Sequence, residues 1–338
     1  MRENRRDWLM NRRSLLMDRA SLPKSRRSVL KGAAASLAAL ALAPYARPAF
    51  AAASKPAARA NPEIVTLNDK LALITGVGGN VVALAGDDGV LLVDTGDAKS
   101  GRALMSQLGK LPGKRKVHTV FNTHYHIDHT GSNEVFAKSG ARILSHQKTK
   151  QWLAIDHWVP AEERYEKARP AKAVPTDAFY TTGKLAAAGE NVEYGYLQEA
   201  HTCGDAYVFF RDSNVLVVGD AVAASGADPE LDWFAGGWVG GRLDSHDLLL
   251  KLANDQTRIV PGTGPVMTKA QLQAERDMTQ KLYDRVVELI RKGFTWEDML
   301  NANILDGLGH TWADPKGFMY AVHKGFWAHH NTLSHDVV

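Results

Sequence analysis

One short stretch, residues 123–131, constrains the chain more than any other. Four potential metal ligands fall within six of its residues, and it directly follows an apolar run: they are His124, His126, Asp128 and His129. Neutral imidazole and carboxylate groups are good ligands for zinc-like ions. Three imidazoles and a carboxylate so close together are unusual on a protein surface unless they bind a cation. The stretch therefore predicts a divalent cation site in a loop at the end of a β-strand.

Other polar residues also come directly after apolar runs, at Asp94, His201, Asp220 and the turn 261–265. Loops at one edge of a rigid sandwich can converge on a common site. Each half of the chain runs from a β-meander to one of these loops, which predicts two β-rich units packed face to face with helices outside. No interior stretch has the composition of a linker, so we expect one domain over residues 63–338.

The first 51 residues have the pattern of an export signal. Arg26 and Arg27 precede a weakly apolar run at 33–43, and the small residues Ala49 and Ala51 form a cleavage site. Paired arginines before the apolar run are typical of twin-arginine signals. The run is also too short for the roughly 20 residues of a spanning helix. We therefore predict a signal peptide at 1–51, the twin-arginine export machinery as a partner, a periplasmic location and no stable membrane span.

The signal segment also carries the positive charge. The chain has 41 Lys and Arg against 37 Asp and Glu, and residues 1–51 hold 11 and 3 of these, so residues 52–338 carry 30 basic and 34 acidic residues. This acidic balance argues against a nucleic-acid partner. Residues 52–62, rich in Ala, Pro and Lys, are expected to form a disordered leader. Met1 and Met17 are both candidate start residues.

Together the motifs resemble the metallo-β-lactamase superfamily. The resemblance rests on the turn 93–96, the H-x-H-x-D-H loop at 124–129, the H-T-x-G-D element at His201 and the Gly-Asp pair at Asp220. It covers residues 67–265. The resemblance implies an α/β fold of four layers, an αββα sandwich, with additional C-terminal helices in this chain.

The resemblance also implies two metal positions. The first would be held by three imidazoles, those of His124, His126 and His201. The second would be held by Asp128 and His129, with Asp220 bridging both. Asp94 would be a buried aspartate that orients the metal loop. Three neutral imidazoles leave an open position on a zinc-like ion, so one or two Zn²⁺ ions per chain are expected, with Fe²⁺ as the alternative.

The chain departs from the family pattern at Thr263, where the P-G-H-G-P turn usually has a histidine that binds the second metal. Three outcomes are open: a weakly held second ion, a replacement ligand, or a single-metal site. Candidate replacements are His310, His323, His329 and His330. Cys203 takes the place of the usual proline of the H-T-P-G-D element, and we favour a packing role for it because buried free cysteine is common.

The loop 227–241 is rich in Gly, Trp and Phe and is a candidate cleft wall. Its aromatic residues Trp233, Phe234 and Trp238, with Tyr125 between two ligands, would line a small-molecule substrate cleft. The other interpretation is an aromatic cluster that fixes this loop to the core. His146 is expected to support the site from outside or to be structural.

Three functions are compatible with these residues. The first is a periplasmic zinc hydrolase in which a metal-bound hydroxide attacks a β-lactam, lactone, ester or thioester carbonyl, with Asp128 orienting the nucleophile or carrying the proton. The second is a mononuclear iron oxidoreductase similar to persulfide dioxygenases, because His124, His201 and Asp220 form a two-His, one-carboxylate set. A metal-binding protein without catalysis is the third and least favoured.

Overall fold

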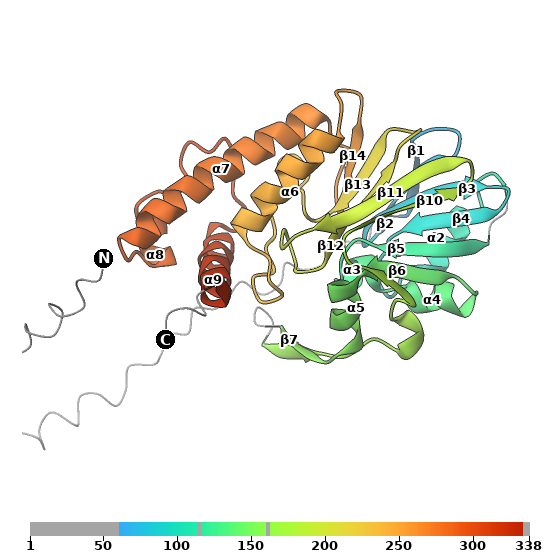
Figure 1. Cartoon of the computed structure of the whole chain (residues 1–338), viewed down its shortest axis with the longest axis horizontal. Helices are drawn as coiled ribbons and strands as arrows, with labels where there is room; N and C mark the ends of the chain where they lie inside the picture. Colours follow the sequence, from blue (N-terminus) through green and yellow to red (C-terminus); the bar gives the residue numbers. More distant parts are fainter. Residues whose placement is uncertain (1–60, 114–115, 160–162, 334–338) are drawn as a thin grey trace, which may run out of the picture. The chain divides into compact units, whose positions relative to one another are not determined.

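The computed structural model describes residues 61–113, 116–159 and 163–333 (Figure 1). The predicted signal peptide at 1–51 and nearly all of the leader at 52–62 lie outside these residues. No helix within the described ranges is long and apolar enough to cross a membrane.

The first sheet has seven strands in the order β1-β2-β3-β4-β5-β6-β9. Its first four strands form an antiparallel meander, and β4, β5, β6 and β9 run parallel. Their bounds are Glu63–Thr66, Leu71–Val77, Gly79–Gly86, Gly89–Val93, Val117–Asn122, Arg142–His146 and Asp177–Phe179. The meander and its turn at Gly89 follow the alternation and turn residues of the sequence.

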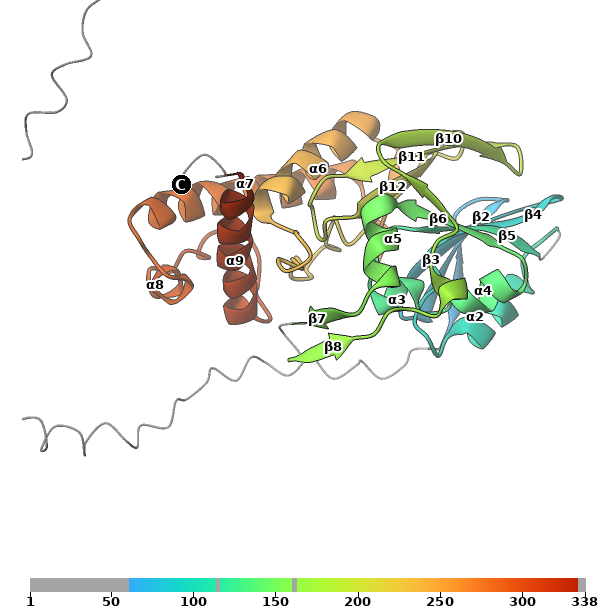
Figure 2. The same cartoon turned by 60° about the horizontal axis from the view of Figure 1, so that its bottom comes forward.

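The second sheet has five strands in the order β10-β11-β12-β13-β14, all antiparallel except the last pair. They are Thr182–Ala187, Glu190–Leu197, Asp205–Phe210, Val215–Gly219 and Arg258–Pro261. A separate hairpin, β7 at His157–Val159 and β8 at Arg164–Glu166, extends from the segment between strands β6 and β9 of the first sheet (Figure 2).

Side chains from both sheets meet in one apolar core. Leu91 and Phe121 of the first sheet and Val208 and Val217 of the second belong to it, and all are at most 3% exposed. The alternate residues of the same strands face outward, where Leu92 packs with Leu104 and Phe136 of two helices. Helices therefore cover the outer face of the first sheet.

The outer face of the second sheet is covered in the same way. Leu216 and Val218 pack with Leu249 and Leu272 of the helices α6 and α7. The order of layers is therefore helix, sheet, sheet, helix, which confirms the predicted αββα sandwich. The helices are α2 Gly101–Leu108, α3 Ile127–Thr130, α4 Asn133–Lys138, α5 Gln147–Ala154, α6 Val239–Leu252, α7 Lys269–Arg291, α8 Trp296–Asn301 and α9 Pro315–Leu333.

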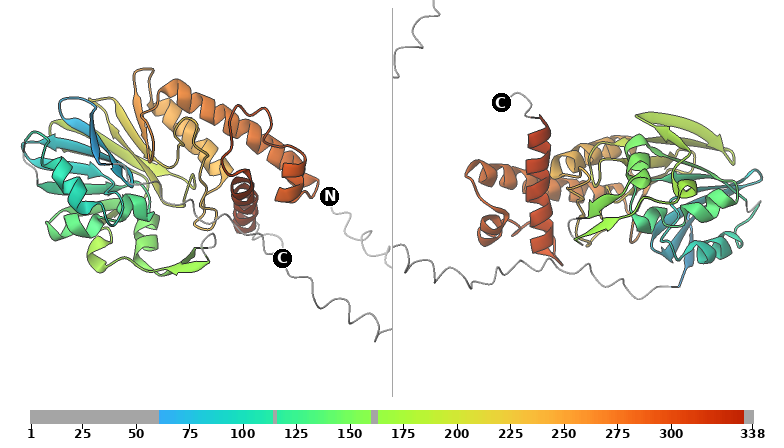
Figure 3. Two further views of the ribbon diagram at one scale, coloured as in Figure 1. Left: turned by 180° about the vertical axis from the view of Figure 1, so that it is seen from behind. Right: turned by 90° about the horizontal axis from the view of Figure 1, so that it is seen from below.

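The C-terminal helices form a cluster of their own, in which Val286, Met299 and Met319 are fully buried. Figure 3 shows α7, α8 and α9 together beside α6 from two further sides. Helix α7 begins with the predicted capping box, in which Thr268 and Gln271 satisfy each other's backbone N–H groups.

Helix α6 begins at Val239, directly after the aromatic residue Trp238. Its first turn contains Gly240 and Gly241, which normally disfavour a helix. A Cβ at Gly241 would lie 2.2 Å from the carbonyl oxygen of Glu199. Close packing against the neighbouring loop therefore requires glycine here and outweighs its low helix propensity.

Candidate metal centre

The predicted ligands come from loops at one end of the two sheets. Strand β5 is buried along most of its length and leads directly into His124 and His126. The short helix α3 starts at Ile127 and carries Asp128 and His129. His201 lies in the connection between β11 and β12, and Asp220 directly follows β13. Three segments distant in sequence therefore meet at this edge of the sandwich.

Four of these side chains form a compact cluster: His124, His126, His201 and Asp220 each offer one ligand atom, and these atoms all lie within 4.8 Å of one another. The closest pair is His201 Nε2 and His126 Nδ1, at 3.1 Å. Asp220 Oδ2 lies 3.3 Å from His124 Nε2 and 3.9 Å from His201 Nε2. These spacings fit a single cation among the four groups.

Asp128 and His129 lie on the other side of Asp220. His129 Nε2 is 3.3 Å from Asp220 Oδ2 and 3.5 Å from Asp128 Oδ2. The imidazole of His129 is completely buried, whereas the side chain of Asp128 is 44% exposed. Asp220 therefore has the position of a bridging carboxylate between the four-residue cluster and this pair.

In the neutral form of these imidazoles, the outward nitrogen faces an acceptor and donates to it, which leaves the other nitrogen with a lone pair. His201 Nδ1 lies 3.0 Å from the carbonyl oxygen of Glu230, which can only accept. His129 Nδ1 lies 2.9 Å from Asp94, and His126 Nε2 lies 3.1 Å from Asp232. The inward nitrogens of the cluster are therefore acceptors that converge, as metal ligation requires.

The buried inward nitrogens support a resident cation. Within the described residues, His124 Nε2 and His129 Nε2 are buried without any hydrogen bond. A polar atom left in this state costs about 1–3 kcal/mol. Burial, followed by the charge of His129, lowers the pKa of His124 well below its usual value. Burial, followed by the charge of His126, lowers that of His201 to about 4. These two imidazoles are therefore neutral ligands, and the residues present fit a divalent metal ion.

Asp94 joins the start of the metal loop to His129. One of its oxygens accepts the backbone N–H of Thr123 at 2.8 Å, and the other accepts the Thr123 hydroxyl at 2.7 Å as well as His129 Nδ1. Burial raises the pKa of Asp94 although all these contacts lower it. The structure thus places Asp94 where the resemblance implied, behind the ligands.

Asp205 positions His201 in a similar way. Its carboxylate accepts the backbone N–H of His201 at 2.6 Å, the backbone N–H of Thr202 at 2.8 Å and the Thr202 hydroxyl at 2.7 Å. Burial raises its pKa to about 7. The H-T-x-G-D pattern is therefore a closed turn that fixes the direction of His201.

A family model described as "Metallo-beta-lactamase superfamily" matches residues 74–264. The chain belongs to the metallo-beta-lactamase superfamily. This match includes every predicted ligand of the two metal positions and all strands of both sheets except β1 and the start of β2.

Solved structures of this superfamily agree with the fold. A metallo-beta-lactamase from Pontibacter korlensis superposes with a TM-score of 0.55 at 20% identity, covering 65% of this chain and 99% of that one. A sec-alkylsulfatase, Pisa1 from Pseudomonas sp., gives a TM-score of 0.56 at 16% identity, covering 81% of this chain and 50% of that one. At these identities the likeness establishes the fold alone.

One curated relative is closer in sequence. The "2,4-dinitroanisole O-demethylase subunit alpha" of Nocardioides sp. (strain JS1661) is 30% identical over 149 residues, which is 42% of this chain. The matched part is 40% of that protein, so this chain corresponds to less than half of its relative's length.

Two residues that support the metallo-beta-lactamase site could not be found from motifs. Asp232 accepts the Tyr125 hydroxyl and lies 3.1 Å from His126 Nε2. Burial alone would raise the pKa of Asp232. Its contacts with His126 and Tyr125 outweigh burial, so this pKa lies below its usual value. Asp232 therefore orients His126 as Asp94 orients His129. Its only signal in the sequence is its place next to the aromatic pair 233–234.

The second of these residues is Arg242, at the start of α6, which is 1% exposed. Its Nη1 donates to the carbonyl oxygens of Asp220 at 3.0 Å and Glu230 at 3.3 Å. Its Nη2 donates to Glu275 of α7 at 2.6 Å. The Glu230 carbonyl is also the acceptor for His201, so one guanidinium holds the backbone beside two candidate ligands.

The turn that lacks the family histidine lies against the second metal position. A Cβ at Gly262 would lie 2.1 Å from Asp220 Oδ1 and 2.9 Å from the His129 ring. The neighbouring Thr263 is exposed. Asn80 holds this turn: its side-chain amide donates to Pro261 O at 2.9 Å and Gly264 O at 2.8 Å, and its backbone N–H donates to Gly262 O at 2.7 Å.

The candidate replacement histidines contact other groups. His310 pairs with Asp228 at 2.7 Å, and His323 accepts the indole N–H of Trp327 at 3.2 Å. His329 stacks on Trp238 with ring centroids 3.7 Å apart. The side chain of His330 lies outside the described part of the structure. None of the three described histidines joins the cluster.

The candidate cleft aromatics divide into two groups. Phe234 is 43% exposed and contacts Trp152 and Trp233, directly beyond Asp232. Tyr125 is buried and stacks on Trp152 with centroids 5.0 Å apart. Trp238 instead packs on Phe326 and His329 of α9. Phe234 is therefore an exposed ring packed on Trp152 and Trp233, Tyr125 is buried against Trp152, and Trp238 fixes the loop to α9.

Cys203 and His146 have packing environments. The Cys203 thiol accepts the indole N–H of Trp152 at 3.1 Å, and burial raises its pKa to about 11. A thiol with this pKa is protonated at neutral pH and is a poor metal ligand. His146 stacks flat on Tyr196 with centroids 3.9 Å apart.

Proposed function

We propose that this chain is a zinc-dependent hydrolase that hydrolyses a β-lactam, lactone, ester or thioester at its carbonyl group. The observation that carries the proposal is the convergence of three imidazoles and Asp220 within 4.8 Å, with the half-exposed carboxylate of Asp128 beside them. Membership of the metallo-beta-lactamase superfamily supports a metal-dependent reaction on a small molecule.

The residues divide into holding and proton-carrying roles. His124, His126 and His201 would hold one zinc ion, and Asp128, His129 and Asp220 would hold part of a second. A zinc ion acts as a Lewis acid and lowers the pKa of bound water to about 7. Asp128 is the one acidic ligand candidate with an open face, because its side chain is 44% exposed while that of Asp220 is 14% exposed. Asp128 is thus placed to accept a proton and pass it to the leaving group.

The names of the similar proteins widen the panel of substrates to be tested. One is an O-demethylase subunit, others are metallo-beta-lactamases, and others are sec-alkyl sulfatases. A panel should therefore contain a chromogenic cephalosporin, a lactone, a thioester and 4-nitrophenyl acetate, with an aryl methyl ether and a secondary alkyl sulfate as the alternatives.

The experiment combines elemental analysis with this panel. We expect one to two zinc ions per chain and turnover of at least one carbonyl compound. His201→Ala should remove both the turnover and the zinc, while Met105→Ala, on the exposed face of α2, should change neither. Turnover of only the ether or the sulfate, or none at all with zinc-loaded protein, would refute carbonyl hydrolysis.

A mononuclear iron oxidoreductase is the second candidate. It is favoured by the exposed Thr263, and by the fact that none of the described candidate histidines replaces the missing ligand. His124, His201 and Asp220 would then hold one Fe²⁺ ion. One iron per chain together with oxygen uptake would support this function and contradict the first.

We also propose that the protein works in the periplasm after export by the twin-arginine machinery. The support is the Arg26-Arg27 pair before an apolar run and an Ala-Phe-Ala site at 49–51. Replacing both arginines by lysine should keep the protein in the cytoplasmic fraction, as measured by cell fractionation. Unchanged periplasmic protein would contradict this route.

A further inference from the structure

A pocket of about 470 Å³ lies beside Thr263. The side chains of Val65 and Leu73 from strands β1 and β2 form one wall, and Val266 with Pro265 forms another. Asn80 and the threonine hydroxyls are its polar groups, and no charged side chain lines it. A volume of this size is within the range of small-molecule sites in proteins.

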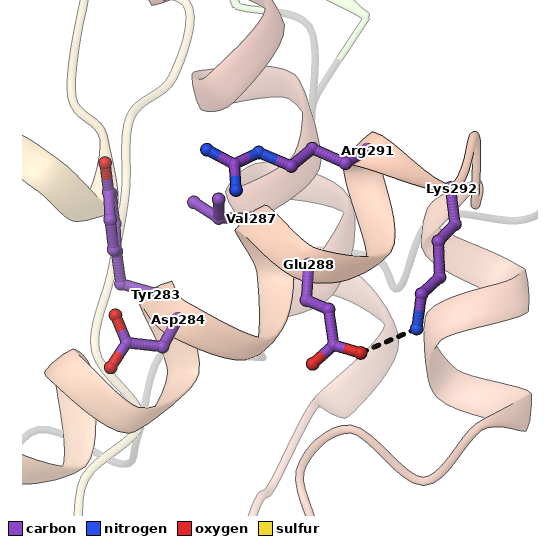
Figure 4. A pocket seen from close by; sticks show the side chains of 6 residues that line it. All are labelled: Tyr283, Asp284, Val287, Glu288, Arg291 and Lys292. Carbon is purple, nitrogen blue, oxygen red and sulfur yellow. Dashed lines mark hydrogen bonds and ion pairs between the residues drawn. The ribbon is translucent and has the colours of Figure 1, made fainter.

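This lining differs from that of a second pocket. That pocket, of about 430 Å³, lies along α7 and is lined by Asp284, Glu288, Arg291 and Lys292, among others (Figure 4). Glu288 and Lys292 pair there at 2.6 Å. A charged lining of this kind stays hydrated, whereas the pocket beside Thr263 offers apolar surface to an uncharged group.

The pocket beside Thr263 also adjoins the metal centre. Gly78 lines it, and a Cβ at Gly78 would lie 3.0 Å from the backbone oxygen of Asp128. Gly262, next to Thr263 in the chain, packs directly on Asp220 and on the ring of His129. The backbone of Gly78 and Gly262 therefore lies between this pocket and the Asp128 and His129 half of the site.

The residue at position 263 determines whether this pocket is open to a ligand. The exposed threonine leaves the pocket open, and the Asn80 amide holds the turn in place without any contribution from the side chain at 263. A longer side chain at this position would reach into the opening. Where the family usually has a metal-binding histidine, Thr263 thus leaves the pocket open.

We propose that the pocket beside Thr263 is a specificity subsite that binds an uncharged alkyl or aryl arm of the substrate, with the Thr263 hydroxyl at its mouth. The proposal rests on the proposed function, because the reacting carbonyl must lie at the adjoining metal centre. Burial of each methylene group of the arm should raise kcat/KM about fourfold.

The test has a catalytic arm and a binding arm. In the catalytic arm, zinc-loaded protein hydrolyses 4-nitrophenyl acetate, butyrate and hexanoate. We expect kcat/KM to rise about fourfold per methylene in the native chain. In Thr263→Trp, which fills the pocket from an exposed position, kcat/KM should not rise with chain length. Met105→Trp is the matched control on the outer face of α2 and should behave as the native chain.

In the binding arm, saturation-transfer NMR follows 1-hexanol with no chemistry involved. The native chain and Met105→Trp should bind it, and Thr263→Trp should not. Val65→Lys, which introduces a charge at a residue 44% exposed on an edge strand, should also lose binding. This second variant changes the same pocket from another strand, so the result does not depend on correct local folding of Thr263→Trp alone.

The outcomes separate this proposal from the proposed function. Absent hexanol binding in the native chain, or binding and chain-length preference that both survive Thr263→Trp, overturns the subsite. If no ester is hydrolysed, the ester branch of the proposed function fails and the binding arm alone decides on the subsite.

Discussion

Arg242 offers the most demanding test of how the fold supports the site. Replacing it by methionine keeps an apolar stem in the space that it fills and removes the guanidinium. Glu275, 8% exposed, would lose its cation, and its Oε2 already has no hydrogen bond within the described residues. Breaking a buried ion pair by removing one partner costs about 3–5 kcal/mol. Arg242→Met should therefore lower the free energy of unfolding by about this amount.

A matched control lies on the same pair of helices. Arg276 pairs with Asp247 at 2.8 Å, but these side chains are 25% and 44% exposed. Exposed pairs contribute about 0–1 kcal/mol, so Arg276→Met should be nearly neutral. Both variants can be compared with the native chain by urea unfolding, where an unchanged m-value shows that the transition is still the same. The double variant Arg242→Met with Glu275→Gln should recover part of the loss.

The same substitution should also weaken metal binding. Without Arg242 Nη1, the carbonyls of Asp220 and Glu230 lose a donor, and the Glu230 carbonyl orients His201. Loss of such supporting contacts typically lowers metal affinity about 10–100-fold. Competition with a zinc chelator measures it. A loss of stability below about 1 kcal/mol, or normal zinc affinity in a destabilised variant, would refute the reasoning.

Three further substitutions test other contacts. Asp232→Asn should lower zinc affinity about 10–100-fold, because His126 loses its carboxylate; chelator competition with unchanged affinity would contradict this. His246 is fully buried, and burial is the main cause that lowers its pKa to about 4. The free energy of unfolding should therefore fall by about 3 kcal/mol as the pH falls from 6.5 to 4. The reason is that only the unfolded chain takes up this proton, so His246→Gln should flatten the pH dependence of urea midpoints. Thr263→His should raise the metal content measured by elemental analysis, and an unchanged content would mean that another group already fills the role.

The sequence predicted the parts of the molecule that rest on continuous patterns. Strands β4 and β13 are buried on both faces, so they appear as unbroken apolar runs, and the polar residues at their ends stand out; β5 keeps apolar residues at Val117, Val120 and Phe121. Their parallel pairing places these ends at one edge of the sandwich. The loop 123–131 and its convergence with Asp220 could therefore be predicted without coordinates.

Other elements had no such pattern. Strand β10 alternates exposed and half-buried positions, and both β10 and β11 contain a glycine, Gly183 or Gly195, and charged residues, so most of this hairpin was not recognised. Asp232 and Arg242 act through contacts with residues far away in the sequence, and single polar residues carry no spacing signal. The start of α6 depends on how closely Gly241 approaches the loop at Glu199. These features exist only once the chain is folded.

The three hydrogen bonds between Asn80 and the turn 261–264 have a consequence for how this edge of the molecule can change. Fixing the backbone of one residue costs about 1–2 kcal/mol of conformational entropy. In a turn that is ordered by its ligand, this cost falls on every binding event. Here the turn is already ordered in the folded chain, so this entropy is lost during folding. The side chain at position 263 can therefore be replaced without a change in the shape of the turn. Position 263 is therefore a place where new substrates can be acquired while the rest of the metal centre stays as it is.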